Sequence, residues 1–302
     1  MRSRLLAAGF AAALVAALAI GCGKSVTAPT PLNDSGQVSA TLASAISLVD
    51  DGLAEDTTSA SAAAASLRPA SVQATVRPFT WWQRITGETR SWSLAFADTD
   101  STGHPKVCVA TLTKHLTGFL VVVPQSPSDS TQPDTTVITK PLDKTLTRRV
   151  LLWHLTIGDV RVWKVVAITG AAVTTPAAVT HIQSVRLHSS SGVDTTITDP
   201  LQWNSLRHVI RFATNDTVTV TVTTLRTDDV VYIHRWDWRH RLHNNLDTTY
   251  SWSWVTSAWP GWRHMGLQAM SNGSLYDDSA RFDMQAWHIP FRVSQPDVDY
   301  YP

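Results

Sequence analysis

The chain contains 302 residues, and its 25 Lys and Arg residues nearly balance its 24 Asp and Glu residues, which leaves a formal net charge of +1 at pH 7. A surface that binds nucleic acid needs clustered basic residues. Only Arg235, Arg239 and Arg241 approach such a cluster, so nucleic acid is excluded as a partner. The two cysteines, Cys22 and Cys108, exclude metal sites of the multi-cysteine kind.

The first 21 residues have the layout of a secretory signal peptide. Arg2 and Arg4 precede an uninterrupted run of apolar and small residues from 5 to 20. This run is short for a membrane span, which needs about 20 apolar residues to cross the hydrocarbon layer. We therefore expect residues 1–21 to direct export and to be removed, which changes the formal charge of the remaining chain to −1.

The residues around Cys22 form a second targeting feature. The sequence Leu18-Ala19-Ile20-Gly21-Cys22 resembles the lipobox of bacterial lipoproteins, in which a peptidase cuts before a cysteine that carries diacylglycerol. The resemblance implies that Cys22 is lipidated and that the chain is exported and anchored to a bacterial membrane. Gly23 is not the aspartate that favours inner-membrane retention in enteric lipoproteins, so the outer membrane or cell surface is favoured over the inner membrane.

A tether and a helical region follow. Residues 22–34 predict a flexible tether, and residues 35–69 predict one amphipathic helix followed by an Ala/Ser-rich linker. Asp34 or Ser35 is a candidate N-cap, and Gly52 lies near the expected helix end. The apolar residues that recur at helical spacing are Val38, Leu42, Ala45, Ile46, Val49 and Leu53.

Residues 70–170 predict an antiparallel β domain, because Val, Thr and Trp recur in short alternating runs separated by turn-forming residues. The candidate strands are 72–85, 90–97, 106–113, 118–123, 146–156 and 161–169. The stretch 86–88 reads as a turn between the first two, and 124–141 reads as a long exposed loop. Cys108 lies within a strand-like run and is expected to be a buried, unreactive thiol.

Residues 181–295 predict a second β domain. Seven short strands in roughly 110 residues are typical of a β-sandwich. The tail resembles the end of bacterial immunoglobulin-like domains, with the turn Pro260-Gly261, the turn 271–274 and a last strand at 286–293. The resemblance implies a module for display or binding, without the inter-sheet disulfide of antibody domains. The expected fold is therefore all-β: a helix, an antiparallel β domain and an immunoglobulin-like β-sandwich.

The sequence contains no recognisable catalytic motif. The turn 98–103 resembles the first half of a calcium loop, but Val109 stands where the bidentate glutamate belongs, which favours a plain hairpin turn. His234, His240, His243 and His264 show no metal-ligand spacing, and on one extended strand His234 and His240 would lie about 20 Å apart. We expect no catalytic residue, no metal site and no cofactor.

Aromatic residues near the C-terminus are candidates for a ligand platform. Alternation along one strand would place Tyr232, His234, Trp236 and Trp238 on one face, and a second row would contain Tyr250, Trp252 and Trp254. The rows form either the core of the sandwich or an exposed surface for sugar rings or a partner protein. In the second case Trp236, Trp238, Trp252 and Trp254 are the binding residues.

These features predict a lipid-anchored cell-envelope protein that acts as a non-catalytic binding or structural module. The chain as a whole resembles no functionally characterised family. One alternative is a carbohydrate-binding accessory protein. Another is an envelope hydrolase or metalloenzyme whose site combines residues distant in sequence. The expected partners are the membrane, through the N-terminal lipid, and an envelope protein or a glycan.

Overall fold

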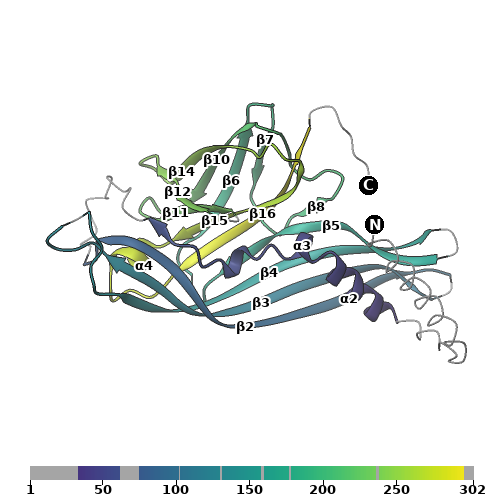
Figure 1. The fold of residues 1–302 in the computed structure, drawn as a ribbon. Coiled ribbons are helices and arrows are strands. Elements are labelled where there is room, and N and C mark those ends of the chain that lie inside the picture. Colours follow the sequence, from purple (N-terminus) through teal and green to yellow (C-terminus); the bar gives the residue numbers. More distant parts are fainter. Residues whose placement is uncertain are drawn as a thin grey trace, which may run out of the picture. The chain divides into compact units, whose positions relative to one another are not determined.

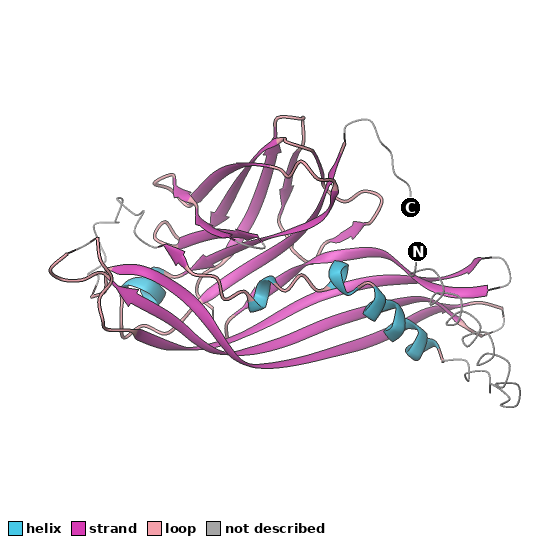
Figure 2. Ribbon diagram, viewed as in Figure 1, coloured by secondary structure: helices cyan, strands magenta, loops and turns pink. Residues whose placement is uncertain are grey.

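The computed structural model describes residues 33–61, 75–101, 103–129, 131–157, 160–176, 178–235 and 238–295. The predicted signal peptide, Cys22, almost all of the tether and most of the Ala/Ser-rich linker lie outside the described residues. Contacts divide the chain into Met1–Asn33 and one compact unit, Asp34–Pro302, which is described here by itself. Strands dominate this unit (Figure 2), so the all-β prediction is confirmed.

The N-terminal helix is confirmed but is shorter than predicted. Helix α2 (Asp34–Ser44) and the single turn α3 (Ile46–Val49) are followed by the 3-10 turn η1 (Leu53–Glu55) and the short strand β1 (Ala60–Ser61). Gly52, with φ of 66°, precedes η1 in the left-handed region that glycine adopts without strain. None of the helices within the described ranges is long and apolar enough to cross a membrane.

Most strands belong to one large sheet of 11 strands. Four long strands, β2 to β5, lie side by side, and the sheet continues with β16, β15, β11 and β12 (Figure 1). In sheet order these are β2 (Pro78–Thr99), β3 (Pro105–Pro124), β4 (Ile138–Ile157), β5 (Val160–Thr174), β16 (Met284–Ser294), β15 (Gly261–Met270), β11 (Val230–Arg235) and β12 (Trp238–Arg241). At the margins, β1 pairs with β2, β8 (Trp203–Ser205) with β5, and β9 (Arg211–Ala213) in parallel with β16.

The predicted strands 72–85 and 90–97 form one long strand, β2, and the predicted strands 106–113 and 118–123 form β3. Residues 86–88 are not a turn, because the register between β2 and β3 shifts at Ile85/Gly87 and pairing then resumes. Opposite this bulge, a Cβ atom on Gly118 would lie 2.0 Å from the carbonyl oxygen of Arg84. Glycine therefore allows the two backbones to approach closely, and the hairpin continues past a position that reads as a turn in the sequence.

A second sheet of five strands packs on part of the first. Its order is β13 (His243–Asn244), β14 (Thr249–Val255), β10 (Thr217–Thr224), β6 (Ile182–Ser189) and β7 (Asp194–Ile197). Side chains of β6, β10 and β14 form one core cluster with side chains of β11, β15 and β16. These two layers form a sandwich, but the immunoglobulin-like arrangement is not confirmed, because one layer continues into β5, β4, β3 and β2.

The boundary predicted between 70–170 and 181–295 does not separate two sheets. Residues 171–174 of β5 pair with residues 285–288 of β16, so both segments contribute to the large sheet. The connection between them is also bound to β16 and the residue before it: Asp283 accepts hydrogen bonds from the backbone of Val179 and from the Thr180 hydroxyl. This segment is therefore part of the folded unit and not a linker between two domains.

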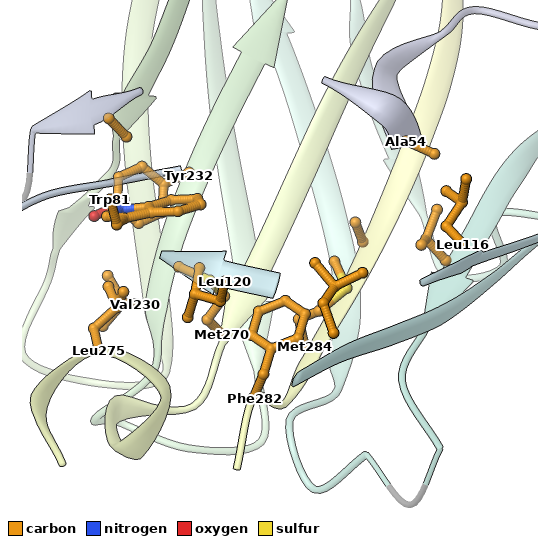
Figure 3. Close-up of a cluster of buried hydrophobic side chains, with 14 of the residues drawn as sticks. Ala54, Trp81, Leu116, Leu120, Val230, Tyr232, Met270, Leu275, Phe282 and Met284 are labelled. Atoms are coloured by element: carbon orange, nitrogen blue, oxygen red, sulfur yellow. The ribbon is translucent and has the colours of Figure 1, made fainter. Parts of the chain in front are cut away.

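The large sheet has two differently covered faces. We call the face that carries Leu112, Leu146 and Tyr232 the inner face, and its opposite the outer face. The N-terminal helices pack on the inner face, where Val38 and Leu42 join the cluster around Cys108 and Leu152. Figure 3 shows a second inner-face cluster, in which Trp81 of β2 lies against Tyr232 of β11 with ring centroids 5.0 Å apart. The five-stranded sheet covers the outer face only at β11, β15 and β16.

Candidate functional site on the large sheet

Buried basic residues alternate with leucines along β4 on the inner face. Lys140, Lys144 and Arg148 are each at most 4% exposed, and Leu142 and Leu146 lie between them. Because side chains on one face of a strand recur every second residue, all five point to the inner face. The alternation is present in the sequence, but it matches no recognised functional motif. Buried cations need counter-charges or hydrogen-bond acceptors.

The counter-charges come from residues 50–56, which we call the acidic segment. Its first aspartate, Asp50, lies 2.7 Å from the Lys114 ammonium and 3.2 Å from the Arg90 guanidinium. Glu55 hydrogen-bonds the same ammonium of Lys114. Burial lowers the pKa of Lys114, but its hydrogen bonds to Asp50 and Glu55 outweigh this effect and raise the pKa. Lys114 therefore stays charged and pairs with both acids.

Asp51 forms the most buried of these contacts. One of its carboxylate oxygens lies 2.6 Å from a nitrogen of Arg148, and the other lies 3.0 Å from Nδ1 of His288. Burial raises the pKa of the Asp51 carboxyl, but the charge of Arg148 and the contact with His288 lower it by more, so the pKa lies well below its ordinary value. Arg148 also donates a hydrogen bond to the Val49 carbonyl oxygen. Arg148 thus binds both a side chain and the backbone of the N-terminal segment.

Asp56 forms a third contact, with β11 and β12. Its carboxylate lies 3.0 Å from Arg239 and 3.3 Å from Nδ1 of His234. The Arg239 guanidinium lies over the Trp81 ring, 4.5 Å from its centroid, and donates to the Thr58 carbonyl. Burial lowers the pKa of His234 to about 4, so this histidine is neutral at neutral pH and its contact with Asp56 is not an ion pair.

Two lysines of β4 bind backbone carbonyls instead of acids. Lys144 donates to the Ala54 carbonyl and to the Gln83 side chain, and Lys140 donates to the carbonyls of Gly273 and Asp277. Burial lowers the pKa of Lys144 to about 7 and that of Lys140 to about 8. Both lysines therefore act as internal hydrogen-bond donors: Lys144 attaches the N-terminal segment to the sheet, and Lys140 attaches α4 (Asn272–Tyr276) and the residue after it.

The histidines lie differently from the sequence expectation. The strand expected over 230–242 is a hairpin of β11 and β12, in which Arg235 is opposite Trp238 and His234 is opposite Arg239. His240 therefore lies on the other face from His234, and its ring stacks on Trp252 at 3.5 Å. Within the described part of the chain, no group of three His, Cys, Asp or Glu residues has the geometry to hold a metal ion.

The predicted aromatic platform is mostly core. Trp254 is 7% exposed, and Trp252 and Trp238 are partly buried against the same cluster between the two sheets. Trp238 does not share a face with Tyr232, because the hairpin reverses the chain between them. Trp236 lies outside the described residues. Tyr250 and Trp254 therefore belong to the core between the sheets, with Trp238 and Trp252 packed against it, whereas Tyr232 is buried on the inner face.

The inner face also contains a buried cysteine and a groove beside α2. Cys108 is buried on the inner face, as expected, and burial raises the pKa of its thiol to about 11. A groove of about 280 Å³ lies between α2 and β2, lined by Ser39, Leu42, Ala43, Ile46, Arg90 and Trp92. Arg90 already pairs with Asp50, so its charge is balanced within the chain.

The buried charged residues therefore lie on a covered part of the inner face, whereas the outer face of the long strands is partly open. The acidic segment supplies the counter-charges of Lys114, Arg148 and Arg239. The outer face of β2, β3 and β4 alternates with the buried inner residues and is half-buried or exposed along most of its length. The chain matches no protein-family model, no curated protein and no solved structure.

Proposed function

We propose that this protein is a lipid-anchored component of a bacterial cell envelope, with a folded unit that serves as a non-catalytic binding or structural module. The observation that carries the proposal is the sequence Leu18-Ala19-Ile20-Gly21-Cys22 at the end of an apolar export segment. Lipid on Cys22 would attach the chain to the membrane, because two or more acyl chains bind far more stably than one.

The contacts of the charged residues support a non-catalytic role. A catalytic acid or base must reach its substrate, whereas Arg148, Lys144 and Asp51 are at most 2% exposed at their side chains or as whole residues. Their partners belong to the chain itself. The outer face of the long strands offers an accessible surface for a partner.

The test is metabolic labelling of the full chain with a fatty-acid analogue. Wild-type protein should carry label, and Cys22→Ala should lose it and should also retain its signal peptide. The matched control is Cys108→Ala, which removes the only other cysteine and should leave labelling unchanged, because that thiol is buried in the core. Equal labelling of wild type and Cys22→Ala would exclude lipidation at this cysteine.

A further inference from the structure

The open outer face of the long strands changes composition along its length. Cross-strand neighbours near its middle are polar: Ser91 of β2 pairs with Thr113 of β3, which pairs with Thr147 of β4. Four residues further along β2, towards the β2–β3 turn, the equivalent neighbours are Ala95, Val109 and Leu151. The outer face is therefore polar in the middle and apolar towards one end of the strands.

The apolar side chains at this end form a continuous surface, which we call the end patch. Ala97 pairs with Val107 and Val107 with Trp153, and Leu155 pairs with Val162 on the adjacent strands. Trp153 is 48% exposed and Val160 is 61% exposed. The members of the end patch are Ala97, Val107, Trp153, Leu155, Val160 and Val162. An uncovered apolar surface of this kind usually marks an interaction site.

The folded unit begins at this same end of the strands. The indole of Trp163, next to Val162 in β5, donates a hydrogen bond of 3.2 Å to the Asp34 carboxylate. Asp34 also lies 3.7 Å from His104, in the β2–β3 turn. A salt bridge of 3.1 Å between Arg161 and Asp100 joins the start of β5 to the β2–β3 turn. The start of α2 and the end patch therefore lie at the same end of the long strands, on opposite faces of the sheet.

Chain length limits how far this end can lie from a lipid on Cys22. Cys22 precedes Asp34 by twelve positions, and a fully extended stretch of that length spans at most about 40 Å. Strand β3 alone has 20 residues, which corresponds to about 65 Å at 3.3 Å per residue. Of the two ends of the long strands, only the end with the patch is held within this reach of the anchor.

The charges around the end patch do not favour a purely electrostatic partner. Three basic residues, Lys106, Arg161 and Lys164, and two acidic residues, Asp98 and Asp100, lie around it, so its net formal charge is small. Interfacial tryptophan with aliphatic neighbours is, in contrast, typical of surfaces at the boundary between headgroups and hydrocarbon. Contact with a bilayer would therefore depend on apolar side chains and respond weakly to salt.

We propose that the end patch lies against the phospholipid bilayer beside the lipid anchor and so orients the folded unit on the membrane. This inference depends on the anchor at Cys22. The lipid supplies attachment, and the patch supplies a second, weaker contact that fixes which end of the long strands faces the membrane. The polar outer face near Ser91 and Thr113 then remains in water.

The experiment uses full-length lipidated protein in vesicles of phosphatidylethanolamine and phosphatidylglycerol, with an environment-sensitive fluorophore on one introduced cysteine. Ala97→Cys and Val160→Cys place the fluorophore on the patch. Ser91→Cys, on the same face of the same strand, and Leu246→Cys, which is 73% exposed beyond β13, are the controls. Acylation of Cys22 and burial of Cys108 leave the introduced thiol as the site of labelling.

Spin-labelled lipids should quench the fluorophores at 97 and 160 several-fold more strongly than those at 91 and 246, and this difference should persist in high salt. Quenching by aqueous iodide at all four positions, with no quenching by lipid, would overturn the proposal. Protection from iodide at 97 and 160 without lipid quenching would also overturn it, because a protein would then cover the patch. If fatty-acid labelling is intact but lipid does not quench the fluorophores at 97 and 160, only the membrane contact of the end patch is refuted. If wild-type protein takes up no fatty-acid label, lipidation of Cys22 and the membrane contact are both refuted.

Discussion

Single side chains explain how an acidic segment can pack against a core face. The guanidinium of Arg148 is 1% exposed, and its counter-charge, Asp51, is 2% exposed. A buried ion pair adds little net stability over an apolar pair, but loss of one partner leaves an uncompensated charge in a medium of low dielectric constant. The contacts of Asp51 and Arg148 therefore favour one position of the segment on the sheet over others.

Replacement of Asp51 by asparagine should lower the free energy of unfolding by about 3–5 kcal/mol, because Arg148 would remain charged and buried without a counter-charge. Urea denaturation at pH 7 measures this change. The matched control is Asp194→Asn, which removes the exposed partner of Arg186 and should not move the midpoint. Wild-type stability of Asp51→Asn would mean that Arg148 is not balanced by this carboxylate.

Buried histidines predict a loss of stability in mild acid. Burial lowers the pKa of both His234 and His264 to about 4. Between pH 6.5 and pH 4 the unfolded chain binds protons that the folded chain does not, so stability falls by about 1.4 kcal/mol per pH unit for each histidine. Burial raises the pKa of Asp229 to about 6, so below pH 6 the folded chain binds a proton there that the unfolded chain does not, which raises stability. The two histidines outweigh this single group.

Unfolding free energies at pH 7 and pH 5 check this prediction. His264→Asn should have a visibly smaller pH dependence than wild type, and His188→Gln, which changes an exposed ring, should keep the wild-type slope. An unchanged slope in His264→Asn would show that this ring is protonated equally in the folded and unfolded chains.

At the scale of elements, a strand's period shows which residues share a face but not what covers that face. Strand β11 is buried on both sides: Tyr232 packs on the inner face with Trp81, and Ile233 packs against the five-stranded sheet. Strand β14 contributes Tyr250 and Trp254 to the core between the sheets. The aromatic rows read from the sequence are therefore a consequence of two stacked layers.

Trp254→Ala should destabilise the protein by about 3–5 kcal/mol, because it removes a large ring from a packed interior. Trp259→Ala changes the same residue type five positions away, where the ring is 77% exposed, and should have little effect on stability. Thermal or urea unfolding followed by circular dichroism distinguishes the two. Equal stability of both variants would contradict the core assignment of Trp254 and would favour the exposed ligand platform instead.

At the scale of the whole molecule, the pairing of β5 with β16 joins two stretches of chain that the sequence suggested were separate domains. The clusters on the inner face combine residues from Ala54 to Ala286, so neither stretch completes its core alone. Cooperative unfolding is the expected behaviour of such a unit.

Unfolding of Asp34–Pro302 within the full chain should therefore show one transition, with coincident midpoints by circular dichroism and tryptophan fluorescence. A protease site inserted within residues 176–179 provides a second measurement. Cleavage there should leave the fragments associated, because β5 and β16 remain hydrogen-bonded. Two separate transitions, or release of a folded fragment of residues 70–170, would restore the two-domain interpretation.

The sequence by itself determined the all-β class, the helix near residues 34–49 and the burial of Cys108, because these depend on local period and composition. It also contained the alternation of lysine and leucine in β4. Only the tertiary structure decided that Asp51 pairs with Arg148 of β4, that Asp56 pairs with Arg239 of β12, and that the two β segments share one sheet. The physical reason is that strand alternation specifies faces within a segment, whereas strand order and charge partners depend on contacts between residues up to 237 positions apart.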